Sequence, residues 1–135
     1  MAVILDSNAV IAFLDRGDAL HRPADAIVRK LLPAQRLLAS VVTYAEVLAG
    51  AKLGHHGEDH VRAFFADLIS AVVPVDFQIA EKAAGIRAQS KALRMPDALI
   101  LATADAGPEI DLVVTGDARA AKVPGLQCRT ELLRA

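Results

Sequence analysis

The sequence has little from which a disulfide-linked or aromatic-rich fold could be built. Its 135 residues include one cysteine, no tryptophan and only 4% aromatic residues. A single cysteine excludes an internal disulfide, so we expect Cys128 to be a small buried hydrophobic residue. A hydrophobic content of 54% with 23% charged residues excludes intrinsic disorder. We therefore expect one domain over residues 1–135 with an aliphatic core, in a reducing, cytoplasmic setting.

Long hydrophobic runs and an excess of positive charge are also missing. No apolar run approaches the ~20 residues that cross a bilayer, and Met1–Leu5 lacks the basic leader of a signal peptide. We therefore expect a soluble protein with no membrane partner. Its 15 Lys and Arg residues against 16 Asp and Glu give a net charge of −1. Any binding to nucleic acid would then depend on local basic patches or on bound metal.

Short apolar runs alternate with helical periodicities along the whole chain. This alternation predicts a three-layer α/β/α domain with a central, mostly parallel sheet of about five strands. The predicted strands are Ala2–Leu5, Leu37–Ala39, Ala71–Val75, Leu112–Val114 and a weaker one near Leu126–Arg129.

Apolar residues at helical spacing predict helices between these strands. The predicted helices cover residues 24–32, residues 61–69, Phe77–Leu93 and, as a buried helix, Ala98–Ala104. Gly54–Glu58 is expected to be a loop. We interpret His55, His56 and His60 as part of this surface loop, because their spacing lacks a zinc-site pattern.

Acidic residues occur where predicted strands end and where helices begin. Asp6 follows the first strand, Asp117 follows the fourth, and Glu46 and Asp97 lie at helix starts. Ligands of open α/β sheets bind outside the carboxyl ends of the strands, so the four acids are expected to converge there. Their mutual repulsion would require a cation or a strong hydrogen-bond network.

Each acid also has a purely structural explanation. Asp6 could cap the next helix, and Asp117 could be a turn residue. Glu46 fits a capping box with Thr43, and Asp97 could cap its own helix after Pro96. Taken together, the four carboxylates favour a hard cation, Mg²⁺ or Mn²⁺, and the hydrolysis of phosphodiester bonds by a metal-activated water.

Four motifs occur in a characteristic order. They are Asp6-Ser7-Asn8, Thr43-x-x-Glu46, Pro96-Asp97-Ala98-Leu99-Ile100 and Val114-Thr115-Gly116-Asp117. With these motifs the chain resembles, over nearly its whole length, the PIN-domain ribonucleases, specifically the VapC toxins of type II toxin–antitoxin systems. The resemblance implies a single PIN domain over residues 1–135 and an endoribonuclease that depends on Mg²⁺ or Mn²⁺. It also implies a homodimer and a hetero-oligomer with a cognate VapB-type antitoxin that covers the acidic pocket.

The resemblance also implies roles for single residues. Asp6 and Asp97 match the main metal-holding positions, and Glu46 and Asp117 match the acids that hold a second metal or waters. Polar supporting positions are matched by Asn8 and Thr115. One departure concerns the last motif: many relatives have Asn where this chain has Asp117, and a further Asp where it has Ala120.

Other functions remain open at the level of sequence. Asp6 could be the phosphoacceptor of an aspartate-based phosphotransferase, although that class commonly has a second Asp where this chain has Asn8. A PIN-like RNA-processing nuclease outside a toxin system is another possibility. The chain could also be a non-catalytic scaffold that binds RNA or protein, although such a surface gains nothing from uncompensated carboxylates.

Two further surfaces have two interpretations each. A basic segment before Asp97 could contact RNA phosphates or form a solvated helix face; it contains Arg87, Lys91 and Arg94. An apolar set could bind an antitoxin or a second copy, with core packing as the simpler interpretation; it comprises Phe13, Leu14 and Tyr44–Leu48.

Overall fold

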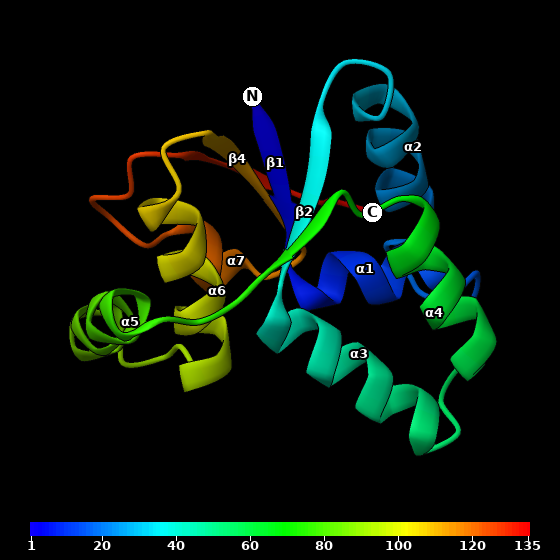
Figure 1. Cartoon of the computed structure of the whole chain (residues 1–135), viewed down its shortest axis with the longest axis horizontal. Helices are drawn as coiled ribbons and strands as arrows, with labels where there is room; N and C mark the ends of the chain where they lie inside the picture. The colour runs from blue at the N-terminus through cyan, green and yellow to red at the C-terminus, as the bar shows by residue number, and fades with distance from the viewer.

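A five-stranded parallel sheet lies between two groups of helices (Figure 1). The structure is a computed structural model that describes residues 1–135. The strands are β1 (Ala2–Leu5), β2 (Arg36–Ser40), β3 (Ala71–Val73), β4 (Ile110–Thr115) and β5 (Arg129–Leu132). Every neighbouring pair is parallel, in the order β3-β2-β1-β4-β5. The predicted three-layer α/β/α fold is therefore confirmed.

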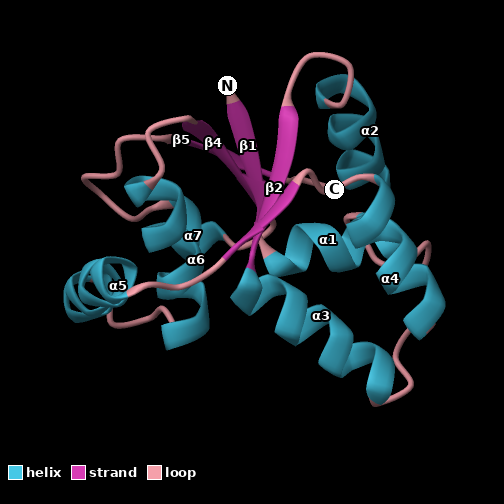
Figure 2. Cartoon of the chain, in the orientation of Figure 1, coloured by secondary structure: helices cyan, strands magenta, loops and turns pink.

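Helices cover both faces of the sheet (Figure 2). One group contains α1 (Ser7–Leu14), α2 (His21–Leu31), α3 (Val41–Lys52) and α4 (Glu58–Asp67). The other contains α5 (Phe77–Gln89), α6 (Met95–Ala106) and α7 (Ala118–Ala121). No helix is long and apolar enough to cross a membrane.

The central strand β1 shows why the strands read as continuous apolar runs. Val3 and Leu5 pack into the core beneath the first group of helices, whereas Ala2 and Ile4 pack into the core on the other face. Successive side chains of a strand point to opposite faces, so a strand covered on both sides needs apolar residues at every position. All four residues of β1 are fully buried.

Two predicted strands are placed differently in the structure. β3 ends at Val73 rather than Val75, because Pro74 has no N–H to donate to the sheet. β5 begins at Arg129, where the prediction had the strand ending. The apolar residue Leu126 packs against the core before this edge strand starts, which explains why the apolar pattern gave the wrong position.

The helical predictions were correct in kind, with shifted ends. α5 stops at Gln89 rather than Leu93, although Leu93 is still buried against the sheet. The buried helix α6 extends beyond Ala98–Ala104 at both ends. His60 lies on α4, so the prediction that placed it in the loop was wrong.

The strand order creates a crevice between β1 and β4. The chain runs outward from β1 through β2 to β3, and then crosses to β4 and β5 on the other side of β1. In an open parallel sheet, ligands bind at such a reversal, outside the carboxyl ends of the strands. Asp6 directly follows β1, and Thr115 is the last residue of β4. The topology therefore places both residues at the expected binding position.

Candidate active site

Asp6 is a carboxylate buried at the carboxyl end of the central strand. It is 2% exposed and is the N-cap residue of α1. Its Oδ1 accepts a hydrogen bond from the backbone N–H of Ser7 at 2.8 Å. Its Oδ2 accepts one from the Thr115 hydroxyl at 2.7 Å. The capping role is real, but it uses one oxygen only and does not account for the rest of the arrangement.

The environment of Asp6 disfavours its negative charge. Burial raises the pKa of this carboxyl to about 6, the bonds from Thr115 and Ser7 oppose the rise, and the carboxylates of Asp97 and Glu46 add to it. Loss of hydration disfavours the charged form of an acid, and nearby like charges act in the same direction. The site therefore has an excess of negative charge that a cation would offset.

Glu46 reaches the site from α3 and is held there by Ser7. Its Oε1 accepts a hydrogen bond from the Ser7 hydroxyl at 2.7 Å, and Thr43 Oγ1 lies 3.1 Å from the same hydroxyl. The capping-box explanation of Glu46 is wrong, because Ser40 is the N-cap of α3 and its side chain accepts from Val42 N–H. Sequence reasoning assigned no role to Ser7, although it lies within the first motif.

Asp97 reaches the site from the first turn of α6. It is 7% exposed, and its Oδ2 lies 3.4 Å from Arg94 Nε. The explanation of Asp97 as a cap is also wrong, because the helix begins at Met95 and Arg94 is the N-cap residue. Pro96 lies in the first turn, where its missing N–H costs no helical hydrogen bond.

Asn8 and Thr115 form a polar support between β1 and β4. Asn8 Oδ1 accepts a hydrogen bond from Gly116 N–H at 2.6 Å, and its amide nitrogen lies 3.4 Å from Asp6 Oδ2. Thr115 donates to Asp6 and accepts from the Asp117 N–H at 3.0 Å. These bonds connect the loops after the two strands and orient the carboxylate of Asp6.

Asp117 lies beside the site, but its side chain pairs with Arg119. It caps the short helix α7 and makes a two-pronged ion pair with Arg119, at 3.0 and 3.1 Å. The hydrogen bonds from Arg119 hold the pKa of Asp117 below its ordinary value. It does not line the cavity that the other three acids share. The structure thus brings Asp6, Glu46 and Asp97 together and leaves Asp117 at the margin.

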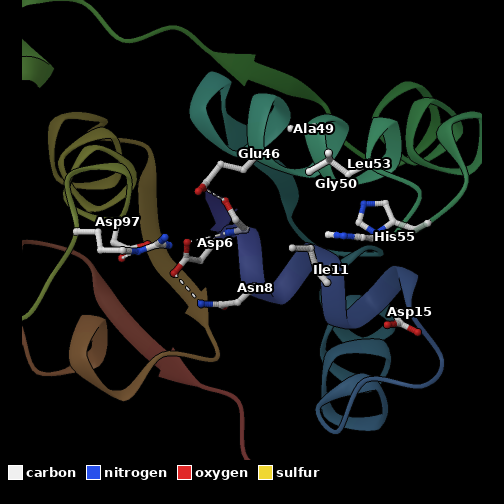
Figure 3. Close-up of a pocket in the computed structure, with 13 residues that line it drawn as sticks. Asp6, Asn8, Ile11, Asp15, Glu46, Ala49, Gly50, Leu53, His55 and Asp97 are labelled. Atoms are coloured by element: carbon white, nitrogen blue, oxygen red, sulfur yellow. Dashed lines mark hydrogen bonds and ion pairs between the residues drawn. The ribbon is translucent and has the colours of Figure 1, made fainter.

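A cavity of about 630 Å³ opens over these groups. Figure 3 shows Asp6, Glu46, Asp97 and Asn8 pointing toward one another at one end, with His55 and Asp15 at the other. His56 also lines this cavity and lies 2.9 Å from the backbone oxygen of Val47 through its Nε2. Sequence reasoning had not placed these histidines near the acids, because only the fold brings the loop after α3 close to α1.

The donor set fits a hard divalent cation, although not as a closed cage. The cavity offers carboxylate oxygens, which Mg²⁺ and Mn²⁺ prefer, and Mg²⁺ is usually held by only one or two carboxylates plus waters. No group of three or more His, Cys, Asp or Glu side chains is placed to hold one ion. The carboxylates instead have protein partners: Ser7 for Glu46, Arg94 for Asp97 and Arg119 for Asp117.

Solved structures with the same fold include several toxin–antitoxin proteins. A toxin–antitoxin complex from Klebsiella pneumoniae is 27% identical with a TM-score of 0.71, covering 91% of this chain and 93% of that one. VapBC2 from Rickettsia felis, bound to a promoter DNA fragment, has a TM-score of 0.77 at 13% identity and covers 99% and 100%.

A third similar structure is VapC20 from Mycobacterium tuberculosis, described as a toxin that cleaves the sarcin–ricin loop. It has a TM-score of 0.72 at 18% identity and covers 95% of this chain and 99% of that one. At identities of 13% and 18%, likeness shows the fold alone. No curated protein sequence matches this chain.

The sequence also matches a family model, and that match agrees with the fold and with the arrangement of the acids. The model is that of the PIN domain, and the matched region is residues 3–126, from β1 to the loop before β5. Because this region is most of the chain, the protein belongs to the PIN domain family.

Proposed function

We propose that this protein is an Mg²⁺- or Mn²⁺-dependent endoribonuclease that acts as the toxin of a type II toxin–antitoxin system. One observation carries the proposal: a buried carboxylate, Asp6, shares a cavity with Glu46 and Asp97 at the topological reversal of a PIN fold. Aspartate phosphotransfer is less well supported, because that class commonly has a second Asp where this chain has Asn8, whose Oδ1 accepts a hydrogen bond from Gly116 N–H.

The proposal assigns each side chain a part in phosphodiester hydrolysis. Asp6 and Asp97 would hold a divalent cation, which when bound supplies a water of lowered pKa and neutralises charge on the phosphate. Thr115 and Asn8 orient Asp6, and Ser7 orients Glu46 toward the same cavity. Asp117 would join them only after leaving Arg119. No serine, cysteine or histidine nucleophile is needed.

The proposed toxin role is supported by the solved structures that share this fold. Similar structures of 27% identity or less are described as toxin–antitoxin complexes from Klebsiella pneumoniae and Rickettsia felis, and as a toxin from Mycobacterium tuberculosis. We accordingly propose a homodimer in the cytoplasm and a VapB-type antitoxin that covers the acidic cavity. The alternative is an RNA-processing nuclease of the same fold outside a toxin system.

Cleavage of RNA by the purified protein tests the proposed activity. We expect cleavage with Mg²⁺ or Mn²⁺, none with EDTA, and a loss of roughly 100-fold or more in Asp6→Asn, because the buried carboxylate contributes directly to metal binding. Glu81→Gln is the control, since Glu81 is an exposed acid on α5 outside the cavity. Undiminished cleavage by Asp6→Asn would disprove the assignment.

A second experiment separates a toxin from an RNA-processing nuclease. The protein is expressed alone and together with the product of any short reading frame found beside its gene, and growth and complex formation are measured. A toxin arrests growth when expressed alone and co-purifies with such a neighbouring product, which relieves the arrest. Cleavage without growth arrest and without a bound partner would point to RNA processing.

A further inference from the structure

The cavity that contains the acids has an unbalanced charge. Four carboxylates line it, those of Asp6, Asp15, Glu46 and Asp97. Arg94 is the only lining residue with a permanent positive charge. An RNA phosphate that approaches these carboxylates is repelled unless positive groups meet it. Arg94 is therefore the one side chain of the cavity suited to a phosphate.

Arg94 is held only weakly in its present position. Its side chain is 67% exposed and its one side-chain contact is Nε to Asp97 Oδ2 at 3.4 Å, long for a hydrogen bond. The two terminal nitrogens of its guanidinium make no hydrogen bond within the protein. Although Arg94 is the N-cap residue of α6, its side chain takes no part in capping the helix. The contact is long and the arginine end of the pair is exposed, so Arg94 loses little when it turns away from the buried Asp97.

The neighbouring arginine, Arg119, is held by more hydrogen bonds than Arg94. Its Nε and Nη2 donate to the two oxygens of Asp117 at 3.1 and 3.0 Å, and its Nη1 donates to the backbone oxygen of Ala92 at 3.3 Å. All three guanidinium nitrogens of Arg119 are thus used inside the protein, and the residue does not line the cavity. Of the two arginines beside the acids, only Arg94 has both terminal nitrogens without a partner in the protein.

We propose that Arg94 is a substrate-binding residue whose terminal nitrogens bind a phosphate of an RNA strand lying in the cavity. The planar guanidinium presents parallel donors that match two phosphate oxygens. Moving from Asp97 to the phosphate also frees the carboxylate of Asp97 for a cation. This inference rests on the proposed ribonuclease function, and its test uses RNA binding as a measurement separate from cleavage.

RNA binding is measured in the Asp6→Asn background, without metal, so that cleavage does not interfere. The probe is a short fluorescein-labelled single-stranded RNA of mixed sequence, followed by fluorescence anisotropy at several salt concentrations. Asp6→Asn is compared with its double variants carrying Arg94→Ala or Arg94→Lys. Arg36→Ala in the same background is the matched control, because Arg36 is an exposed arginine that starts β2, at the opposite edge of the sheet.

Loss of one charge-assisted phosphate contact should weaken binding about tenfold in the Arg94→Ala double variant. The slope of log affinity against log salt should become shallower by about 0.7, the value for one phosphate contact on a single strand. Arg94→Lys should recover the slope but only part of the affinity, because lysine keeps the charge and lacks the two-pronged geometry. Arg36→Ala should behave like the parent.

Equal affinity and equal salt slope with and without Arg94 would overturn the inference, as would a weaker affinity with an unchanged slope. Different results would disprove the ribonuclease function and the Arg94 contact. If wild-type protein cuts no RNA but binding depends on Arg94, the nuclease function is wrong and the phosphate contact stands. If wild-type protein cuts RNA and Arg94→Ala leaves both KM and binding unchanged, the nuclease function stands and Arg94 has no part in it.

Discussion

At neutral pH the carboxylate of Asp6 must be charged in a buried position that water hardly reaches. Burial and the acids beside it raise its pKa from the ordinary 3.8 to about 6. The folded protein therefore binds this proton more tightly than the unfolded chain does. It follows that the contribution of Asp6 to stability is greatest below pH 4 and is lost as the pH rises to about 6.

The pH dependence of stability should reveal the raised pKa of Asp6. In the metal-free protein, the difference in unfolding free energy between wild type and Asp6→Asn should change by about 2.4 kcal/mol between pH 4 and pH 7. Asn cannot ionise, so the wild-type protein should lose stability relative to the variant as the pH rises from 4 to 7. Urea unfolding in EDTA at several pH values measures the difference, in which other titrating groups cancel. A difference that does not vary with pH would contradict the raised pKa.

At the scale of elements, two helices meet at the site through a single hydroxyl. Ser7 is the first residue of α1, and it fixes the Glu46 carboxylate on α3 at 2.7 Å. Buried support of this kind orients a functional carboxylate that would otherwise sample several rotamers. The tie between α1 and α3 is therefore expected to affect activity more than stability.

A double-mutant cycle tests this connection. Ser7→Ala should lower RNA cleavage roughly 10- to 100-fold, as losses of supporting hydrogen bonds around metal sites do. In a Glu46→Gln background the same change should have little further effect, because the carboxylate it orients is already gone. Ser90→Ala, at the end of α5 with no side-chain hydrogen bond, is the control. Additive losses would show that Ser7 acts independently of Glu46.

The bounds of the strands and helices also show where the local sequence pattern predicts the structure and where it does not. The strand β1 was predicted with its observed bounds because complete burial makes all four of its residues apolar. The edge strand β5 was misplaced because only one neighbour pairs with it and its residues alternate between exposed and half-buried. Glu46 and Asp97 could be explained as caps from spacing alone, but the real caps, Ser40 and Arg94, lie a few residues earlier.

At the scale of the whole molecule, a protein of net charge −1 is proposed to act on a polyanion. The cavity alone contributes four carboxylates against one arginine. Bound cations would supply the positive charge that the composition lacks, and Arg94 would add to it. Metal binding and folding should therefore be coupled, because the unfolded chain has no preformed group of carboxylates.

Thermal unfolding with and without metal measures this coupling. Mg²⁺ or Mn²⁺ at about ten times its Kd should stabilise the wild-type protein by about 1.4 kcal/mol. Asp97→Asn should lose most of this stabilisation, whereas Glu81→Gln, on the exposed surface of α5, should keep it. Equal stabilisation of both variants would place the metal elsewhere, and no stabilisation of any variant would favour a scaffold that binds without cutting.

The sequence by itself determined the fold class and the central strand, and it singled out Asp6, Glu46 and Asp97, which line the cavity, together with Asp117, which does not, but it missed Asp15. These properties follow from burial, from periodicity and from acidic residues just after a strand or near the start of a helix, all of which are local. Only the tertiary structure decided which acids meet and what each one contacts. The side chain of Asp117 pairs with Arg119, two residues further along the chain, whereas Asp6 and Thr115, 109 positions apart, share a hydrogen bond. Spacing along a chain cannot predict a partner as distant as Thr115 is from Asp6, because the contact depends on β1 and β4 becoming neighbours in the sheet.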